Sequence, residues 1–304
     1  MLDAEVAFMP HASWPFLALL LISLWPPRFA TAPAGGALPS VAVTSSTSHL
    51  APSCGPGLPD DPGLAWSLIG HMTTDFPTSA PGRNFNMALA SKRLCGTLIP
   101  PGGVFSFNGQ LGESGKTQGY QVGRVFIGDR IVPGYGGGVC QVASTIYEAA
   151  LRAGLAIDER HQHGLTVPYL LPGEDSTISY GALDLRVRND TGGPIRLVTR
   201  AEGGRVTAEF FGTRQPPEVR WIHKELRHIP FYTIRKSDPS LPKGKEEVDA
   251  PGQDGVIVHS WLERTWPDGR TEKFDMGVDS YRASPRIVRV GTGSAADGAA
   301  APSD

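Results

Sequence analysis

Residues 135–155, YGGGVCQVASTIYEAALRAGL, set a cysteine between three consecutive glycines and a largely apolar run. In the run, apolar residues return every three or four positions, which is the spacing of one helix face, and Gly154 stands where a helix C-terminus is expected. The pattern predicts a helix over residues 140–153 with Cys140 at its start. The surroundings of this helix N-terminus therefore decide what the cysteine can do.

A cysteine at the start of a helix has a distinctive electrostatic setting. The unpaired backbone N–H groups and the helix dipole stabilise a thiolate and lower the pKa of the thiol. The same N–H groups can bind the oxyanion that forms when a thiolate attacks a carbonyl. Gly136, Gly137 and Gly138 either leave room for a substrate or form a sharp turn that tucks Cys140 under the helix. The stretch alone leaves both interpretations open.

Histidines and an acid follow the cysteine in the chain order of papain-like and transglutaminase-like acyl-transfer sites. His161 and His163 are two residues apart, so on a strand they point to the same face. In GALDLRVRN, the alternation of apolar and polar residues predicts a later strand with Asp184 on its polar face. We expect Cys140 as the nucleophile and His163, or less favourably His161, as the base. Asp184 would fix the imidazole tautomer, and Gln141 completes the candidate catalytic residues.

Two other interpretations of these residues remain. Asp184 can be a solvated acid on a strand face, paired with the arginines beside it. A histidine pair on one strand face is also a good chelating pair, so His161 and His163 can hold a metal ion with Cys140 or Asp175 as further ligands.

Composition narrows the class of protein. The chain has 304 residues, 40% hydrophobic residues and a net charge of −2, which support a packed core and argue against a nucleic-acid partner. Its 37 glycines and 27 prolines predict a turn-rich, mostly β protein. No G-x-x-x-x-G-K-[ST] motif surrounds the glycines, and we expect no cofactor.

The N-terminal region reads as an export signal followed by a linker. Residues 14–25, WPFLALLLISLW, form an apolar run shorter than a relaxed membrane span of about 20 residues. Small residues follow at 30–32, but no Lys or Arg precedes the run, so residues 1–35 are expected to be a signal peptide or an N-terminal membrane anchor. Residues 36–65 are rich in Pro, Ser and Gly and are expected to be a linker.

Four stretches in sequence, PPGGVFSFNGQLG, GGGVCQVASTIYEAALRAGL, ERHQHGLTVPY and PGEDSTISYGALDLRVRNDTG, resemble the VanW family over residues 66–213. That family is named for an accessory protein of vancomycin-resistance clusters, and its biochemical activity is not settled. The resemblance implies an exported or membrane-tethered bacterial envelope protein. It places the family's glycine-cysteine-glutamine motif on residues 136–141, its histidines on His161 and His163, and its acidic positions on Asp175 and Asp184.

The cysteines depart from that family in one place. Cys95 stands where a polar residue such as asparagine is expected, and a disulfide to Cys54 would account for it. An exported chain with three cysteines leaves one unpaired. We expect a free Cys140, with a bridge from Cys140 to Cys54 or Cys95 as the alternative.

Residues 224–293 contain alternating segments such as VIVHSWLERTW separated by glycine turns, and they resemble the G-five domain of bacterial surface proteins. This resemblance implies an elongated, largely single-layer sheet that is sometimes proposed to bind N-acetylglucosamine. A pure spacer is the alternative. Residues 294–304 are small and polar and are expected to be a disordered tail.

The sequence thus predicts an α+β domain of short helices and antiparallel strands, followed by a small elongated all-β module. The expected function is that of an exported cell-envelope enzyme, a cysteine-dependent amidase or transpeptidase acting on peptidoglycan peptides. A non-catalytic wall-binding protein and a metal-binding domain are the alternatives. The expected partner is peptidoglycan or another cell-wall polymer, with a membrane tether as an option and no nucleic acid.

Overall fold

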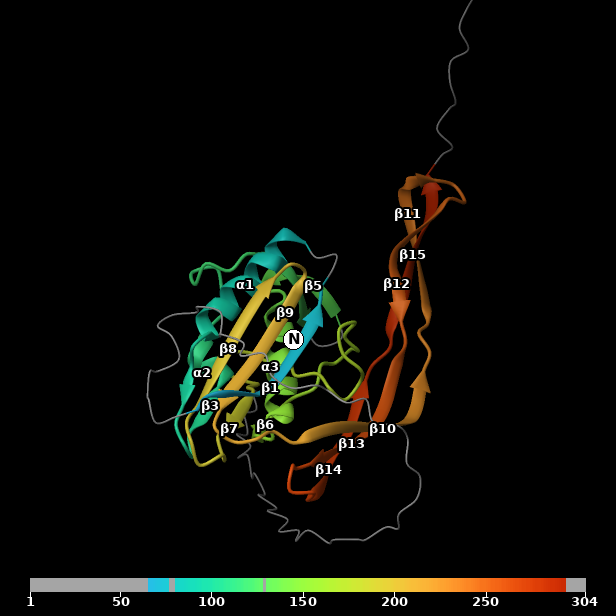
Figure 1. Ribbon diagram of the computed structural model, residues 1–304. Helices are drawn as coiled ribbons and strands as arrows, with labels where there is room; N and C mark the ends of the chain where they lie inside the picture. The colour runs from blue at the N-terminus through green and yellow to red at the C-terminus, as the bar shows by residue number, and fades with distance from the viewer. Residues whose placement is uncertain (1–64, 77–79, 128–129, 294–304) are drawn as a thin grey trace, which may run out of the picture. The chain divides into compact units, whose positions relative to one another are not determined.

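The computed structural model describes residues 65–76, 80–127 and 130–293, which belong to one compact unit (Figure 1). The predictions of a signal peptide or anchor over residues 1–35, of a linker over 36–65 and of a tail over 294–304 concern segments outside these residues. The predicted partner Cys54 is outside them as well. No helix among the described residues is long and apolar enough to cross a membrane.

A four-stranded antiparallel sheet forms the centre of the first domain. Its strand order is β1-β9-β8-β2, built from β1 (Ser67–Asp75), β9 (Arg205–Gly212), β8 (Ile195–Glu202) and β2 (Leu98–Ile99). Helix α3 (Val139–Arg152) packs on β1 and β9, while α1 (Pro81–Leu94) packs on β8 and against α3. The two helices therefore cover one face of the sheet (Figure 1).

Helix α3 is the central element of the core. It is buried almost throughout, because its side chains are apolar or small on nearly every side. The sheet approaches it closely at Gly70 of β1, where an added Cβ would lie 2.4 Å from the backbone nitrogen of Ala153. The helix predicted over residues 140–153 is confirmed within one residue at each end. Gly154, with a φ of 73°, follows the cap residue as expected.

Smaller elements complete the first domain. β3 (Val104–Ser106), β7 (Arg186–Arg188) and β6 (Ala156–Glu159) form a three-stranded sheet, and β4 (Val122–Ile127) pairs with β5 (Arg130–Tyr135). The short helix α2 (Phe107–Leu111) is capped at its N-terminus by Ser106, whose hydroxyl accepts the backbone N–H of Gly109 at 2.9 Å.

One expectation about the strands was wrong. His161 and His163 do not lie on a strand, because β6 ends at Glu159 and the chain continues without regular structure. The alternation predicted after Asp184 is present, since Leu185 and Val187 are fully buried and their neighbours Arg186 and Arg188 are exposed.

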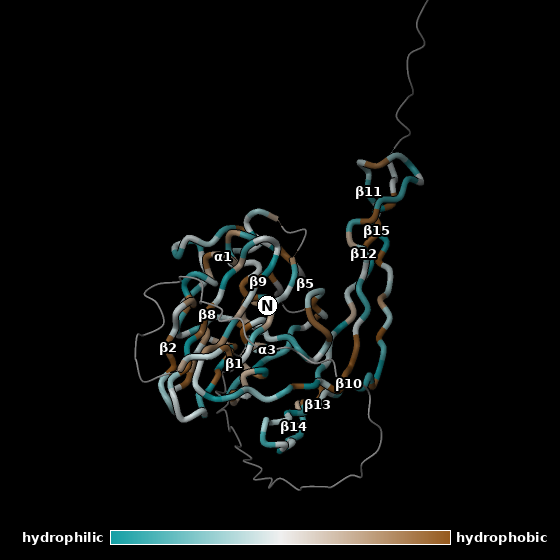
Figure 2. Tube along the Cα trace, viewed as in Figure 1, coloured by the Kyte–Doolittle hydropathy of each residue, from teal (hydrophilic) through white to brown (hydrophobic). Residues whose placement is uncertain are grey.

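The C-terminal module consists of two three-stranded sheets. The first has the order β10-β13-β14, with β10 (Glu218–Ile229), β13 (Gly255–Thr265) and β14 (Thr271–Tyr281) antiparallel. The second has the order β11-β15-β12, with β11 (Thr233–Pro242) parallel to β15 (Ser284–Gly293) and β12 (Glu246–Gln253) antiparallel to it. Hydrophobic and hydrophilic residues are mixed along these strands (Figure 2). The predicted fold class, an α+β domain followed by an all-β module, is confirmed.

A candidate cysteine site

Cys140 is the second residue of α3, and the three glycines before it are required by the backbone. Gly136 and Gly138 have φ angles of 77° and 105°, a region that favours glycine. At Gly137, an added Cβ would lie 2.6 Å from the carbonyl oxygen of Arg124 on β4. The sharp-turn interpretation therefore accounts for the glycines. The same turn also forms one wall of a pocket.

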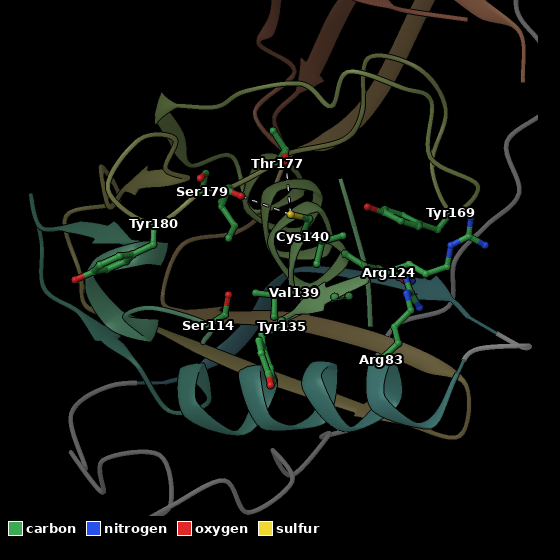
Figure 3. Close-up of a pocket in the computed structure, with 17 residues that line it drawn as sticks. Arg83, Ser114, Arg124, Tyr135, Val139, Cys140, Tyr169, Thr177, Ser179 and Tyr180 are labelled. Atoms are coloured by element: carbon green, nitrogen blue, oxygen red, sulfur yellow. Dashed lines mark hydrogen bonds between the residues drawn. The ribbon is translucent and has the colours of Figure 1, made fainter. Parts of the chain in front are cut away.

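The pocket has a volume of about 290 Å³, and Cys140 reaches it from the start of α3 (Figure 3). The half-buried thiol is 3.5 Å from the hydroxyl of Thr177 and 3.7 Å from the carbonyl oxygen of Ile178. Cys140 lies at the helix start, as predicted, and it lines this pocket. Other side chains that line the pocket include Arg83, Ser114, Arg124, Tyr135, Tyr169 and Tyr180.

The imidazole of His163 lies between this thiol and a buried carboxylate. Its Nδ1 is 2.5 Å from Oδ2 of Asp175, and the same oxygen accepts the backbone N–H of His163 at 2.8 Å. On its other side the ring interacts electrostatically with the Cys140 side chain. The imidazole is thus hydrogen-bonded to the carboxylate and interacts with the thiol, and His163 and Asp175 are both buried.

Asp175 is held from several directions. The hydroxyl of Tyr281, the last residue of β14, donates to its Oδ1, and Nη2 of Arg160 is 3.3 Å from the same oxygen. The Arg160 guanidinium also binds both carboxylate oxygens of Asp279 at 2.8 Å. Two residues of the first C-terminal sheet thus help to fix the acid that binds His163.

Electrostatics shift the Cys140 thiol toward its thiolate and the His163 imidazole toward its protonated form. Burial would raise the pKa of Cys140, but hydrogen bonding to His163 and the charge of His163 outweigh it, so the pKa is lowered. Burial would lower the pKa of His163, but its hydrogen bonds to Asp175 and Cys140 raise it to about 9. Burial likewise opposes ionisation of Asp175, yet His163 and Arg160 hold its pKa below the usual value.

The acid beside the histidine is Asp175, which corrects the expectation that Asp184 fixes the imidazole. Asp184 instead accepts a hydrogen bond from the hydroxyl of Ser106 at 2.5 Å and one from the backbone N–H of Asn108 at 2.8 Å. It therefore fixes the start of α2. Asp175 was considered in the sequence only as a metal ligand and as an acidic family position, because the segment around it carries no strand or helix pattern.

His161 and Gln141 are not joined to the thiol. The imidazole of His161 pairs with Glu159 at 2.9 Å. The buried amide of Gln141 accepts a hydrogen bond from Nη2 of Arg83 at 2.5 Å and donates to the hydroxyl of Thr74 at 2.9 Å. Gln141 thus positions Arg83 at the pocket rather than reaching the thiol.

The structure also bears on the state of the cysteines and on the alternative of a metal site. Cys140 is a free thiol, as expected, whereas Cys95 is disulfide-bonded. The two histidines do not converge with Cys140 on one point, since His161 pairs with Glu159. Within the described ranges, no group of three or more His, Cys, Asp or Glu residues is placed to hold a metal ion.

Two curated proteins are similar to this chain. The chain is 33% identical over 180 residues to YoaR, an uncharacterised protein of Bacillus subtilis (strain 168), covering 59% of this chain and 56% of YoaR. It is 32% identical over 138 residues to the vancomycin B-type resistance protein VanW of Enterococcus faecalis (strain ATCC 700802 / V583), covering 43% and 50%. The chain thus spans about half the length of these curated relatives.

Solved structures and family models match as well. An IgA1 protease G5 domain is 23% identical, covers 27% of this chain and all of its own, and has a TM-score of 0.18. The G5 domain HP0197-G5 is 21% identical, covers 25% and 95%, and has a TM-score of 0.15. The model of VanW-like proteins matches residues 82–211, and that of the G5 domain matches residues 222–293. The chain therefore carries a VanW-like domain followed by a C-terminal G5 domain.

Proposed function

We propose that this protein is a cysteine-dependent acyl-transfer enzyme of the bacterial cell envelope, an amidase or transpeptidase that acts on peptidoglycan peptides. The single observation that carries the proposal is the placement of the buried His163 imidazole between the Cys140 thiol and the Asp175 carboxylate. Such a chain of groups is what a nucleophilic cysteine requires, because the base must be in reach and must itself be oriented.

The chemistry follows from this geometry. The Cys140 thiolate attacks the carbonyl carbon of a substrate amide, and the N-terminus of α3 stabilises the oxyanion that forms. The carbon–nitrogen bond breaks as the His163 imidazolium gives its proton to the leaving amine, which leaves a thioester on Cys140. Neutral His163 then removes a proton from water or from an acceptor amine, which attacks the thioester and restores the thiol. Hydrolysis completes an amidase cycle, and aminolysis completes a transpeptidase cycle.

The envelope setting is supported by the relatives. One of them is named a vancomycin B-type resistance protein, and the C-terminal module matches the G5 domain. We propose peptidoglycan or another wall polymer as the partner and an extracytoplasmic location. We also retain the proposed boundaries, with a VanW-like domain over residues 66–213 and a G5-like module over residues 224–293.

A non-catalytic wall-binding protein is the second candidate. One observation favours it, namely that the turn and its close packing account for Gly136, Gly137 and Gly138 without any substrate. In that case Cys140 forms no thioester, and wall binding should be unaffected by its replacement.

The test is the pH dependence of Cys140 alkylation by iodoacetamide in the intact protein. An ordinary thiol titrates near pH 8.5, whereas Cys140 should react well below that pH because its pKa is lowered. His163→Ala and Asp175→Asn should each move the profile upward, by about one pH unit or more, because they weaken the imidazolium. Asp184→Asn is the matched control and should move it little.

The substrate class is tested on isolated cell wall. Wild-type protein should acquire a covalent adduct on the Cys140 peptide, detected by mass spectrometry, and Cys140→Ala should not. A titration like that of an ordinary thiol, unmoved by either triad variant, would make wall binding the better proposal.

A further inference from the structure

The pocket in front of Cys140 contains two guanidinium groups and no carboxylate. Arg83 and Arg124 line it, and no Asp or Glu is among the lining residues in the described part of the chain. The thiolate of Cys140 is balanced by the imidazolium of His163. The remaining lining is neutral, so the pocket favours an anionic ligand.

Arg83 is built into the pocket from α1. Its guanidinium binds Oε1 of Gln141, and the amide of Gln141 is itself fixed by Thr74 and by the backbone carbonyl of Asp75 at 3.2 Å. Partial burial lowers the pKa of Arg83, while Tyr169 and Cys140 oppose that shift. A guanidinium close to the thiol is thus held in place by a buried polar network.

Arg124 reaches the same pocket from a different element. It lies on β4, whose backbone packs against Gly137. Its side chain is exposed, and it forms no hydrogen bond or ion pair with the described residues. Figure 3 shows Arg83, Arg124 and Tyr169 on one side of the pocket, with Cys140 at its centre.

We propose that this pocket binds a carboxylate of the substrate peptide through Arg83 and Arg124, within one or two residues of the carbonyl that Cys140 attacks. Guanidinium groups suit carboxylates because they form paired, charge-assisted hydrogen bonds. A volume of about 290 Å³ accommodates a short peptide end rather than a long polymer segment. The inference rests on the proposed function, since it names the substrate of that site. The carboxylate can be a free C-terminus or an acidic side chain.

The first test compares two alkylating reagents on the intact protein. Iodoacetate and iodoacetamide form the same sulfur–carbon bond and release iodide, but only iodoacetate carries a carboxylate. We take the rate constant for iodoacetate over that for iodoacetamide at Cys140 and divide it by the same ratio for N-acetylcysteine. This normalised ratio should be about 10, which is the scale of one added charge-assisted contact.

Matched variants assign that preference to the pocket. Arg124→Gln should remove most of it, Arg124→Lys should retain part of it, and Arg220→Gln, an exposed arginine of β10, should leave it unchanged. A normalised ratio of one or less in the wild type, or a ratio that Arg124→Gln does not lower, would overturn the inference. The pH profile with iodoacetamide separately reports on the proposed nucleophile, so the two failures are distinguishable.

The second test identifies the source of the carboxylate by protection of Cys140 from iodoacetamide. The probes are acetyl-Ala-Ala, its C-terminal amide and acetyl-Glu-Ala-amide. Protection by the first alone assigns a C-terminal carboxylate, and protection by the third assigns a side chain. Equal protection by the neutral amide, or no protection by any of the three, contradicts carboxylate recognition.

Discussion

The two sheets of the C-terminal module differ in what they touch. The sheet β10-β13-β14 contributes Leu262 to the core cluster of the first domain, and Trp221 and Met276 pack against that cluster. The sheet β11-β15-β12 has only Leu241 and Val288 as buried hydrophobic side chains among the described residues. One half of the module is therefore part of the first domain's packing, while the other half relies on strand pairing and surface contacts.

This difference changes how the module boundary is understood. All buried residues of the main core except Leu262 lie between Ile69 and Phe210, so a fragment of residues 66–213 is still expected to fold. Such a fragment lacks Tyr281, which donates to Asp175, and Asp279, which holds Arg160. Its fold and its site geometry are therefore separable. Limited proteolysis tests the domain boundaries, and we expect cuts within residues 26–65 and between about 213 and 228.

The largest expected effect is at Leu262. Leu262→Ala removes a fully buried side chain from the main core and should lower the free energy of unfolding by about 2–5 kcal/mol. Leu241→Ala, in the second sheet, should cost less because that sheet packs fewer neighbours around it. Urea titration of the two variants measures both values. Equal losses would show that the two sheets are equally embedded.

The next effect concerns Glu148, a buried residue of α3 that contacts the C-terminal sheet β10-β13-β14 through Trp221. Its carboxylate accepts the indole N–H of Trp221 at 3.0 Å and pairs with Arg152 at 3.3 Å. Burial, reinforced by the charge of Glu174, raises the pKa of Glu148 to about 8. The unfolded carboxyl titrates near pH 4.3, so the unfolded state loses its proton first.

The folded protein should therefore lose stability as the pH rises from about 4.3 to about 8. Glu148→Gln should abolish this loss, with a gain at pH 8 on the order of 2–4 kcal/mol relative to the wild type. Glu247→Gln, in the second sheet, is the control and should leave the pH dependence unchanged. A wild-type protein whose free energy of unfolding is flat over this range would contradict a buried, protonated Glu148.

The smallest expected effect is at Tyr281. Tyr281→Phe removes one donor from Asp175 while His163 and Arg160 remain, so the alkylation profile of Cys140 should shift by about half a pH unit, equivalent to about 0.7 kcal/mol. Tyr232→Phe, an exposed tyrosine of the same module, serves as the control. An unchanged profile in Tyr281→Phe would show that the first sheet supports the fold without tuning the site.

Local patterns predicted the elements better than the site. Helix α3 was predictable because its apolar spacing and its terminal Gly154 are both local signals. The alternation of Leu185 and Val187 also gave the correct buried face of β7. Cys140 at a helix start follows directly from the same pattern.

The remaining site depends on contacts that no local pattern encodes. Asp175 lies in a segment without periodicity, and its tyrosine partner is 106 residues further along the chain. Asp184 was the natural expectation because it sits beside a readable strand, yet its carboxylate is used by Ser106 and Asn108. Choosing between Asp175 and Asp184 required knowing which of their two loops packs against α3.

One carboxylate oxygen of Asp175 accepts two hydrogen bonds from His163, and this restricts the motion of the imidazole ring. Oδ2 accepts both the imidazole Nδ1 and the backbone N–H of His163, so the carboxylate is tied to the residue's main chain as well as to its side chain. A half-turn of the imidazole about its Cβ–Cγ bond would place a carbon where Nδ1 now binds and would break that hydrogen bond inside a buried site. The hydrogen bonds therefore hold the ring in one orientation, in which Nδ1 is committed to Asp175 and only Nε2 is left to exchange a proton with another group.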